Sequence, residues 1–150
     1  MSGKKITIIF CTFAALLVAG FLIWDVSRGK VEILLERNAI EKAATNYLKA
    51  EKEGDLKQAY ALLAPSSAYK KTHSYDEFLK DMANYPPVKI NTFKIVDIYR
   101  LRDNDSRDNY PGVDKFVQVE VDVTFANSDE NSIFNYCFTF LKEKGRWYKG

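Results

Sequence analysis

The sequence predicts an α+β fold, in which an apolar N-terminal helix precedes a domain of helices and antiparallel strands. Three observations lead to this prediction. Residues 6–24 contain no charged residue, apolar residues then recur at steps of three and four up to about residue 84, and after residue 88 they alternate with polar ones. Steps of three and four are typical of amphipathic helices, and alternation is typical of half-buried strands. Helices followed by strands give an α+β domain.

The segment from Ile6 to Trp24 predicts a transmembrane helix. As an α-helix it would be ~28 Å long, which matches the hydrocarbon core of a bilayer. Lys4 and Lys5 precede the segment, and Trp24 ends it where an interfacial aromatic residue is expected. A cleaved signal peptide, with its cleavage site near residues 18–20, is the alternative.

The predicted anchor leaves room for one folded domain of about 120 residues. We expect residues 1–30 to form a short cytoplasmic tail and the transmembrane anchor, and residues 31–38 to form a linker or a helical extension. Residues 39–150 would then form the folded domain. Because a short positive tail stays inside the cell, we expect a single-pass protein of the cell membrane with this domain outside the cytoplasm.

The folded domain has a balanced charge. Residues 1–30 hold four Lys/Arg and one Asp, so the rest of the chain holds eighteen basic side chains against nineteen acidic ones. A domain with this balance lacks the basic surface that nucleic acid requires, so we expect no nucleic-acid partner. The seven glycines are scattered without the spacing of a phosphate-binding loop, and we expect no cofactor.

Three helices are predicted between residues 39 and 88. An apolar stripe over residues 40–51 forms the first, and Gly54 ends it. Asp55 caps a second, shorter helix, which Pro65 stops. A polar loop follows, and then Ser74–Glu77 forms a capping box that begins the third helix.

Three strands and the start of a fourth are predicted after residue 88. They cover residues 89–101, 116–125, 133–141 and 147–148. Alternation in the first strand is disturbed at Ile95, which predicts a bulge or burial on both faces. The second strand has the clearest alternation, and four valines share its predicted core face: Val117, Val119, Val121 and Val123.

Several short runs resemble the nuclear-transport-factor-2-like (cystatin-like cone) superfamily. These runs are Asn46–Ala50, Gly54–Tyr60, Leu63–Ser67, Ser74–Phe78 and Lys144–Tyr148. The likeness covers roughly the predicted folded domain and is nearest to small membrane-anchored or lipoprotein-type bacterial members. It implies a cone-shaped domain of three helices packed on a curved antiparallel sheet, with a cavity between them. Members of the superfamily include enzymes, ligand binders and scaffolds, so the resemblance leaves the function open.

The resemblance also indicates candidate pocket residues. Enzymes similar to this fold use a carboxylate inside the cone as a general base, with its pKa raised by burial. Asp97 is the candidate, because Phe93 and other apolar residues share its parity in the strand. For the aromatic residues of the set, a plain core position is the alternative. The predicted pocket-lining residues are Tyr47, Tyr60, Phe93, Asp97, Tyr136 and Trp147.

No catalytic or metal site is predicted. His73 is the single histidine and has serines nearby in sequence, but a nucleophilic site needs a base and an orienting group within reach. One histidine with Cys137 cannot supply the ligands of a zinc site. Residues 102–114 place aspartates at three positions of a calcium loop, but Arg107 and Asp108 break the pattern.

The sequence therefore predicts a non-catalytic protein-interaction or scaffold module. Its expected partners are a protein of the cell envelope or a second copy of the chain. The alternative is a module that binds a small apolar molecule or a lipid in the cavity of the cone. An enzyme of the isomerase or dehydratase type is the third hypothesis.

Overall fold

The computed structural model describes residues 3–101, 110, 112–126 and 132–150. The chain divides into two units, Met1–Leu35 and Glu36–Gly150. Helix α1 (Gly3–Glu53) begins in the first unit, runs without a break through residues 31–38, and ends in the second. Residues 102–109, on which most of the calcium hypothesis depends, lie outside the described residues.

The predicted transmembrane helix at Ile6–Trp24 is wrong, and so is the predicted single-pass anchor. Within the part of the chain that the structure describes, no helix combines the length and the apolar character needed to cross a membrane. Such a crossing requires roughly 20 consecutive apolar residues. The segment is instead the first part of the longer helix α1.

Three shorter helices follow α1, and their ends are set by local hydrogen bonds. Gly54 ends α1 in the left-handed region, with φ 71°, as the sequence predicts. Asp55 caps the next helix by accepting the Gln58 N–H at 3.0 Å, and the Ser74–Glu77 capping box is confirmed. A five-residue helix capped by Ser67 replaces the predicted loop. The helices are α2 (Leu56–Ala61), α3 (Ala68–Thr72) and α4 (Tyr75–Asn84).

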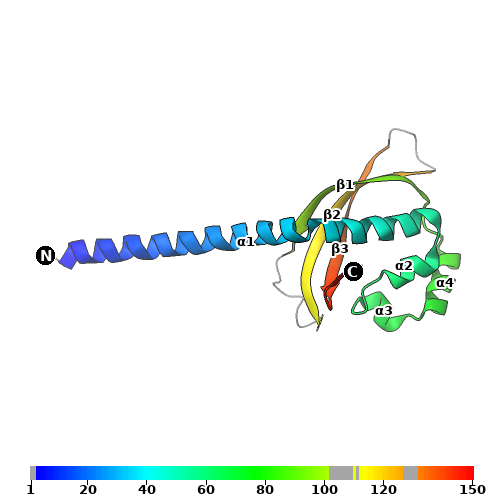
Figure 1. Cartoon of the computed structure of the whole chain (residues 1–150), viewed down its shortest axis with the longest axis horizontal. Coiled ribbons are helices and arrows are strands. Elements are labelled where there is room, and N and C mark those ends of the chain that lie inside the picture. Colours follow the sequence, from blue (N-terminus) through cyan, green and yellow to red (C-terminus); the bar gives the residue numbers. More distant parts are fainter. Residues whose placement is uncertain (1–2, 102–109, 111, 127–131) are drawn as a thin grey trace. The chain divides into compact units, whose positions relative to one another are not determined.

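Four antiparallel strands form a curled sheet in the order β1-β2-β3-β4 (Figure 1). The predicted disturbance in the first strand is confirmed as a register shift between Ile95 and Asp97. The last strand is short and pairs only with residues 140–143. The strands are β1 (Ile90–Arg100), β2 (Val113–Phe125), β3 (Phe134–Glu143) and β4 (Arg146–Lys149).

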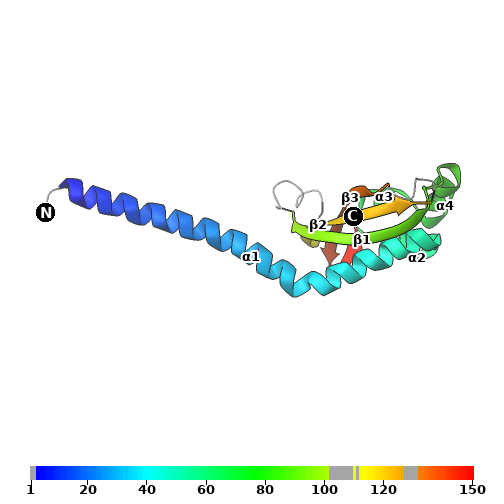
Figure 2. The same cartoon turned by 90° about the horizontal axis from the view of Figure 1, so that it is seen from above.

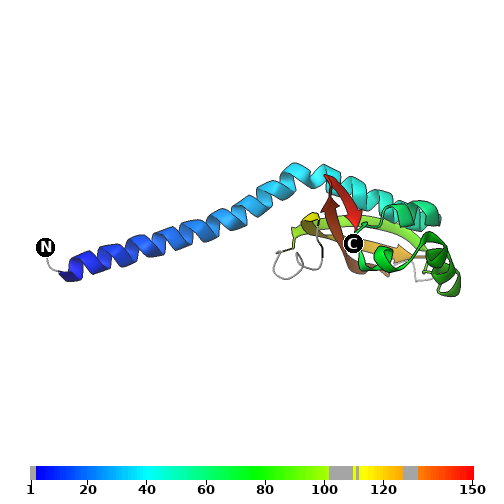
Figure 3. The ribbon, with the colours of Figure 1, turned by 90° about the horizontal axis from the view of Figure 1, so that it is seen from below.

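Helical segments contact both faces of the sheet. Lys142 on β3 contacts Glu36 of α1, whereas the next residue, Glu143, contacts Ser66 between α2 and α3. Because successive side chains of a strand point to opposite faces, α1 covers one face and the segment after α2 covers the other. Figure 2 shows α1 and α3 on opposite sides of the strands, and Figure 3 shows the same from below. The arrangement differs from the predicted cone, in which all helices share one side.

The main core lies on the α1 side of the sheet. The four valines predicted to share a face on the second strand are at most 3 % exposed, which confirms their burial. Phe140, next to Val117 in the sheet register, is 1 % exposed. From α1 the core receives three residues that are fully or almost fully buried, namely Ile40, Ala44 and Leu48.

A segment after α2 runs along the outer edge of β4. It carries the chain from the face covered by α1 to the opposite face of the sheet. The backbone N–H of Lys149 donates to the Leu62 carbonyl at 2.9 Å, and the Ala64 N–H donates to the Lys149 carbonyl at 2.7 Å. Ala64 then packs against Phe116 and Leu141 in a smaller core cluster. The chain thus crosses the edge of the sheet at residues 62–64, which we call the edge segment.

One carboxylate joins α1 to three strands. Glu36 accepts hydrogen bonds from Lys115 Nζ at 2.7 Å, Lys142 Nζ at 2.6 Å and Trp147 Nε1 at 3.1 Å. Burial raises the pKa of Glu36, but the hydrogen bonds and charges of the two lysines outweigh it, and the net pKa lies below its ordinary value. We call this group of four residues the Glu36 cluster.

We expect Glu36→Ala to lower the free energy of unfolding by about 2 kcal/mol, because it removes the carboxylate that accepts from Lys142 Nζ, Lys115 Nζ and Trp147 Nε1. The control is Glu41→Ala on the same helix, which removes a pair with Arg37 whose side chains are each 38 % exposed, and it should cost about 0.5 kcal/mol. Urea unfolding measures both. Equal losses in the two variants would contradict the role assigned to the Glu36 cluster.

A comparison of the native chain with Glu36→Ala at different pH values tests the same role. Because the folded-state pKa of Glu36 is lowered, its contribution is fully present above the ordinary glutamate pKa of about 4.3. The contribution is lost as the pH falls through the lowered value. The difference in stability between the native chain and Glu36→Ala should therefore shrink in acid.

Candidate ligand-binding site

A cavity of about 800 Å³ lies in the second unit, where the uncovered part of β3 meets the end of α1 and the short helices. Its volume falls within the range of roughly 300–1,000 Å³ that is typical of small-molecule sites. The wall is mainly apolar and draws on every helix and on the sheet. Representative apolar lining residues are Leu56, Leu63, Phe78, Met82, Phe116 and Phe138.

Three polar side chains are grouped in the wall of this cavity. The Tyr47 hydroxyl donates a hydrogen bond to the Glu51 carboxylate one helical turn later, and Lys149 Nζ lies 5.9 Å from the centre of the Tyr47 ring. Burial raises the pKa of Tyr47, and the neighbouring Glu51 raises it further. Burial lowers the pKa of Lys149, against the opposite effect of Glu51. The cavity therefore carries one hydroxyl, one carboxylate and one ammonium in a single polar group.

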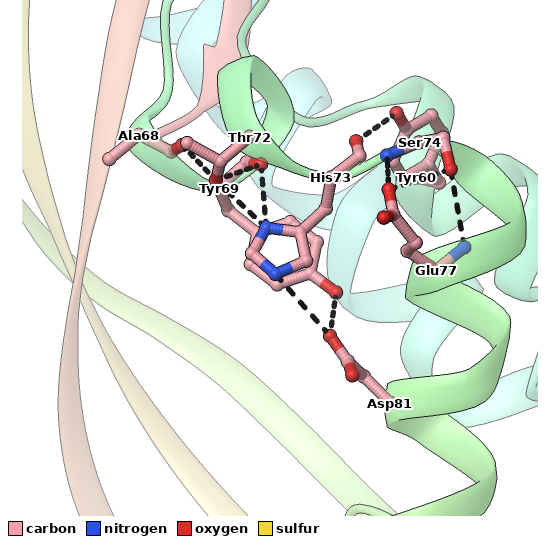
Figure 4. A network of polar contacts seen from close by, with 8 residues as sticks. All are labelled: Tyr60, Ala68, Tyr69, Thr72, His73, Ser74, Glu77 and Asp81. Atoms are coloured by element: carbon pink, nitrogen blue, oxygen red, sulfur yellow. Dashed lines mark hydrogen bonds and ion pairs between the residues drawn. The ribbon is translucent and has the colours of Figure 1, made fainter.

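A network between α3 and α4 fixes a further lining residue, Tyr69 (Figure 4). Its hydroxyl donates to Asp81 Oδ2 at 2.5 Å, and its ring stacks on His73 with centroids 4.3 Å apart and planes 6° apart. His73 Nε2 lies 3.9 Å from the same Asp81 oxygen. Partial burial and the hydrogen bond to Asp81 raise the pKa of Tyr69 to about 12. The network holds the Tyr69 hydroxyl in its neutral form and at a fixed position.

His73 joins α3 to α4 rather than facing a serine hydroxyl. Its Nδ1 lies 2.8 Å from Thr72 Oγ1 and 3.2 Å from the Tyr69 carbonyl oxygen. The nearby serines make other hydrogen bonds: Ser66 donates to Glu143, Ser67 accepts from the Lys70 N–H, and Ser74 pairs with Glu77. The contacts described for His73 thus position two short helices.

Of the predicted pocket residues, Tyr47 lines the cavity, whereas Tyr60 and Trp147 have other contacts. Tyr60 donates its hydroxyl to the His73 carbonyl at 2.8 Å and packs against Phe78 with ring centroids 5.4 Å apart. Trp147 is 7 % exposed and belongs to the Glu36 cluster. Both residues position elements that form the cavity wall.

The other three predicted pocket residues lie on the sheet and are not among the lining residues of the cavity. Phe93 is paired with Val123 and is half-buried. Tyr136 is 41 % exposed on β3. The Asp97 side chain is 47 % exposed and lies 3.9 Å from Arg37, because the register shift after Ile95 changes which face each residue of β1 points to.

Glu51, Lys149 and Tyr69 are polar lining residues that are absent from the predicted set. Glu51 follows Tyr47 by four residues, which places both on one face of a helix and could have been recognised from spacing. Lys149 shares the parity of Trp147 in a strand. Tyr69 lies in a five-residue helix, and a helix this short gives no periodic signal.

Comparison with known proteins adds no relative. No protein-family model matches the sequence, and no curated protein matches it. The resemblance to the nuclear-transport-factor-2-like superfamily therefore stays a prediction.

We expect Lys149→Met to raise the free energy of unfolding by about 1 kcal/mol at neutral pH, because it removes an ammonium that burial disfavours. The lowered folded-state pKa means that the unfolded chain holds this proton more tightly, so the native protein should gain stability as the pH rises toward about 10.4. The gain from the substitution should shrink over the same range. Thermal unfolding at a series of pH values measures it.

Lys57→Met on α2 is the control for this comparison, because Lys57 is exposed. It should leave both the stability and its pH dependence almost unchanged. A loss of stability in Lys149→Met at neutral pH would contradict the assigned burial penalty.

Proposed function

We propose that residues 36–150 bind a small apolar or amphipathic molecule in the cavity, without converting it chemically. The observation that carries the proposal is an open cavity of about 800 Å³ with a mainly apolar wall. Apolar surface that stays accessible forgoes ~25 cal/mol per Å² of burial free energy. A bound apolar molecule recovers that free energy, which is the physical reason why sites of this kind bind ligands.

The charges of the polar group narrow the class of ligand. Glu51 and Lys149 contribute opposite charges, so the cavity has no excess charge that would select a phosphate or a strongly cationic molecule. The Lys149 ammonium can donate hydrogen bonds, whereas the Glu51 carboxylate and the Tyr47 oxygen, whose proton Glu51 accepts, can accept them. This combination suits a neutral head that both donates and accepts hydrogen bonds. We infer an elongated apolar body with a neutral polar end, such as an alcohol, an amide or a sterol-like hydroxyl.

The sequence favours a scaffold over a ligand binder. We now prefer the ligand binder, because of the cavity. A pure scaffold has no use for an accessible apolar interior, because filling it with side chains would stabilise the fold. The scaffold hypothesis stays as the second candidate. Its support is a pair of exposed aromatic side chains on β3, Phe134 at 42 % and Tyr136 at 41 %.

We expect Met82→Trp to weaken binding of the fluorescent probe anilinonaphthalene sulfonate about tenfold, because the larger side chain occupies the cavity. Met82 lies on α4 and lines the cavity. Ala83→Trp is the matched control. Ala83 is the next residue of the same helix, is exposed and does not line the cavity. Fluorescence titration of the full chain measures both variants.

Two results would contradict the proposal. One is equal binding of the probe by the native chain and Met82→Trp, provided that thermal unfolding shows both proteins folded. The other is native mass spectrometry of the full chain, purified from its own cells, that finds the protein free of any small molecule and equally free after incubation with long-chain alcohols and amides.

A further inference from the structure

We propose that Lys149 forms a reversible imine with an aldehyde or ketone group of the molecule that the cavity holds. The inference rests on the proposed function, because it names a reactive group of the ligand that this same cavity would bind. A carbonyl is neutral, as the balance of charges in the cavity requires. Three features carry the inference: the position of the lysine, its apolar surroundings and a neighbouring pair of a hydroxyl and a carboxylate.

Backbone hydrogen bonds hold Lys149 in the cavity wall. On one side Lys149 pairs with Phe140 of β3, and on the other it exchanges hydrogen bonds of 2.9 Å and 2.7 Å with the edge segment. Its Nζ donates to the Gly150 carbonyl and lies 5.9 Å from the centre of the Tyr47 ring. Both of these residues line the cavity together with Lys149, so the nitrogen lies at the cavity wall.

The surroundings of Lys149 favour the form of the amine that reacts. A neutral amine has a lone pair that can attack a carbonyl carbon, whereas an ammonium has none. Burial lowers the pKa of Lys149, and the charge of Glu51 opposes this effect only in part. At neutral pH, Lys149 is therefore a neutral amine more often than an exposed lysine is.

A reactive role also explains why a lysine occupies this position. Burial of an ammonium costs stability, and an apolar side chain of similar length would suit the mainly apolar wall better. Among the described residues, Lys149 is the only lysine that lines the cavity. A buried group with a perturbed pKa in a cavity is a candidate for chemistry, and a desolvated lysine amine is a nucleophile toward carbonyl groups.

The proposed step exchanges a carbonyl oxygen for the lysine nitrogen. The lone pair of neutral Nζ attacks the carbonyl carbon, the π pair of C=O moves to the oxygen, and a proton passes from the nitrogen to that oxygen. The resulting hydroxyl takes a second proton and leaves as water while the nitrogen lone pair forms C=N. The nitrogen then gives up its last proton, so amine and carbonyl give imine and water without an oxidant or a reductant.

Tyr47 and Glu51 can carry the protons of this step. Glu51 accepts the hydrogen bond of the Tyr47 hydroxyl, and both residues line the cavity. Burial and the neighbouring Glu51 raise the pKa of Tyr47, so the hydroxyl keeps its proton at rest and the carboxylate is the base. Water reverses the step, and the bound molecule then leaves unchanged, in agreement with binding without net conversion.

Reductive trapping with decanal in the full chain tests the proposal. Sodium cyanoborohydride reduces an imine to a secondary amine, so each lysine that forms an imine with decanal keeps a decyl group. Peptide mass spectrometry then compares Lys149 with Lys49 and Lys57, which are exposed. After a short reaction we expect Lys149 to carry at least about tenfold more label than either of them, because the cavity holds the aldehyde beside the amine.

Two further measurements show whether the label depends on the cavity. An excess of 1-decanol, which has the same apolar body and no carbonyl, should suppress labelling at Lys149 and leave labelling at Lys57 unchanged. Met82→Trp, which fills the cavity, should also suppress labelling at Lys149, whereas Ala83→Trp should label like the native chain. This pattern would support a reactive lysine inside the cavity.

Two results would overturn the proposal. One is labelling of Lys149 no faster than that of Lys57 in a native chain that binds anilinonaphthalene sulfonate, which leaves the proposed function standing. The other is preferential labelling of Lys149 that neither 1-decanol nor Met82→Trp reduces, which places the reactivity outside the cavity. A native chain that binds neither the probe nor 1-decanol would instead contradict the proposed function, and this inference with it.

Discussion

The second unit depends on the contact between one carboxylate and three strands. Glu36 holds donors from β2, β3 and β4, so the position of α1 across the sheet is fixed at this point. From there the helix carries Ile40 and Leu48 over the main core and brings Tyr47 to the cavity. A partly buried carboxylate with only one partner would be costly, whereas Glu36 has two ammonium groups and an indole N–H as donors.

The cavity follows from the way in which the chain covers the sheet. The edge segment crosses beside β4, so the short helices reach the face that α1 leaves uncovered. β4 is too short to extend along all of β3, and the space beyond its end is bordered by α2, α4 and the end of α1. The accessible apolar interior lies in this space.

Local signals predicted the elements well, and tertiary contacts decided what the sequence could not. The glycine after α1, the Ser74–Glu77 box and the valines of β2 each act through near neighbours or strict alternation. The apolar segment Ile6–Trp24 was misassigned as a separate span because composition alone cannot show where a helix ends. Of the predicted pocket residues, Tyr47 lines the cavity, whereas Asp97 follows a register shift in β1. Such a shift decides which face of the sheet a side chain meets, and alternation in the sequence does not reveal it.

The edge segment has a consequence for how the chain acquires its fold. Ser66 and Glu143 are 77 residues apart in sequence, and Glu36 and Trp147 are 111 apart. Contacts between such distant residues require large loops to close, which slows folding. During synthesis, α1 must wait for β2 and β3, and the edge segment must wait until β4 has left the ribosome, before they can bind their partners. Until then their apolar surfaces are open to other chains, so the interval before closure is when this protein is most exposed to aggregation and to chaperones.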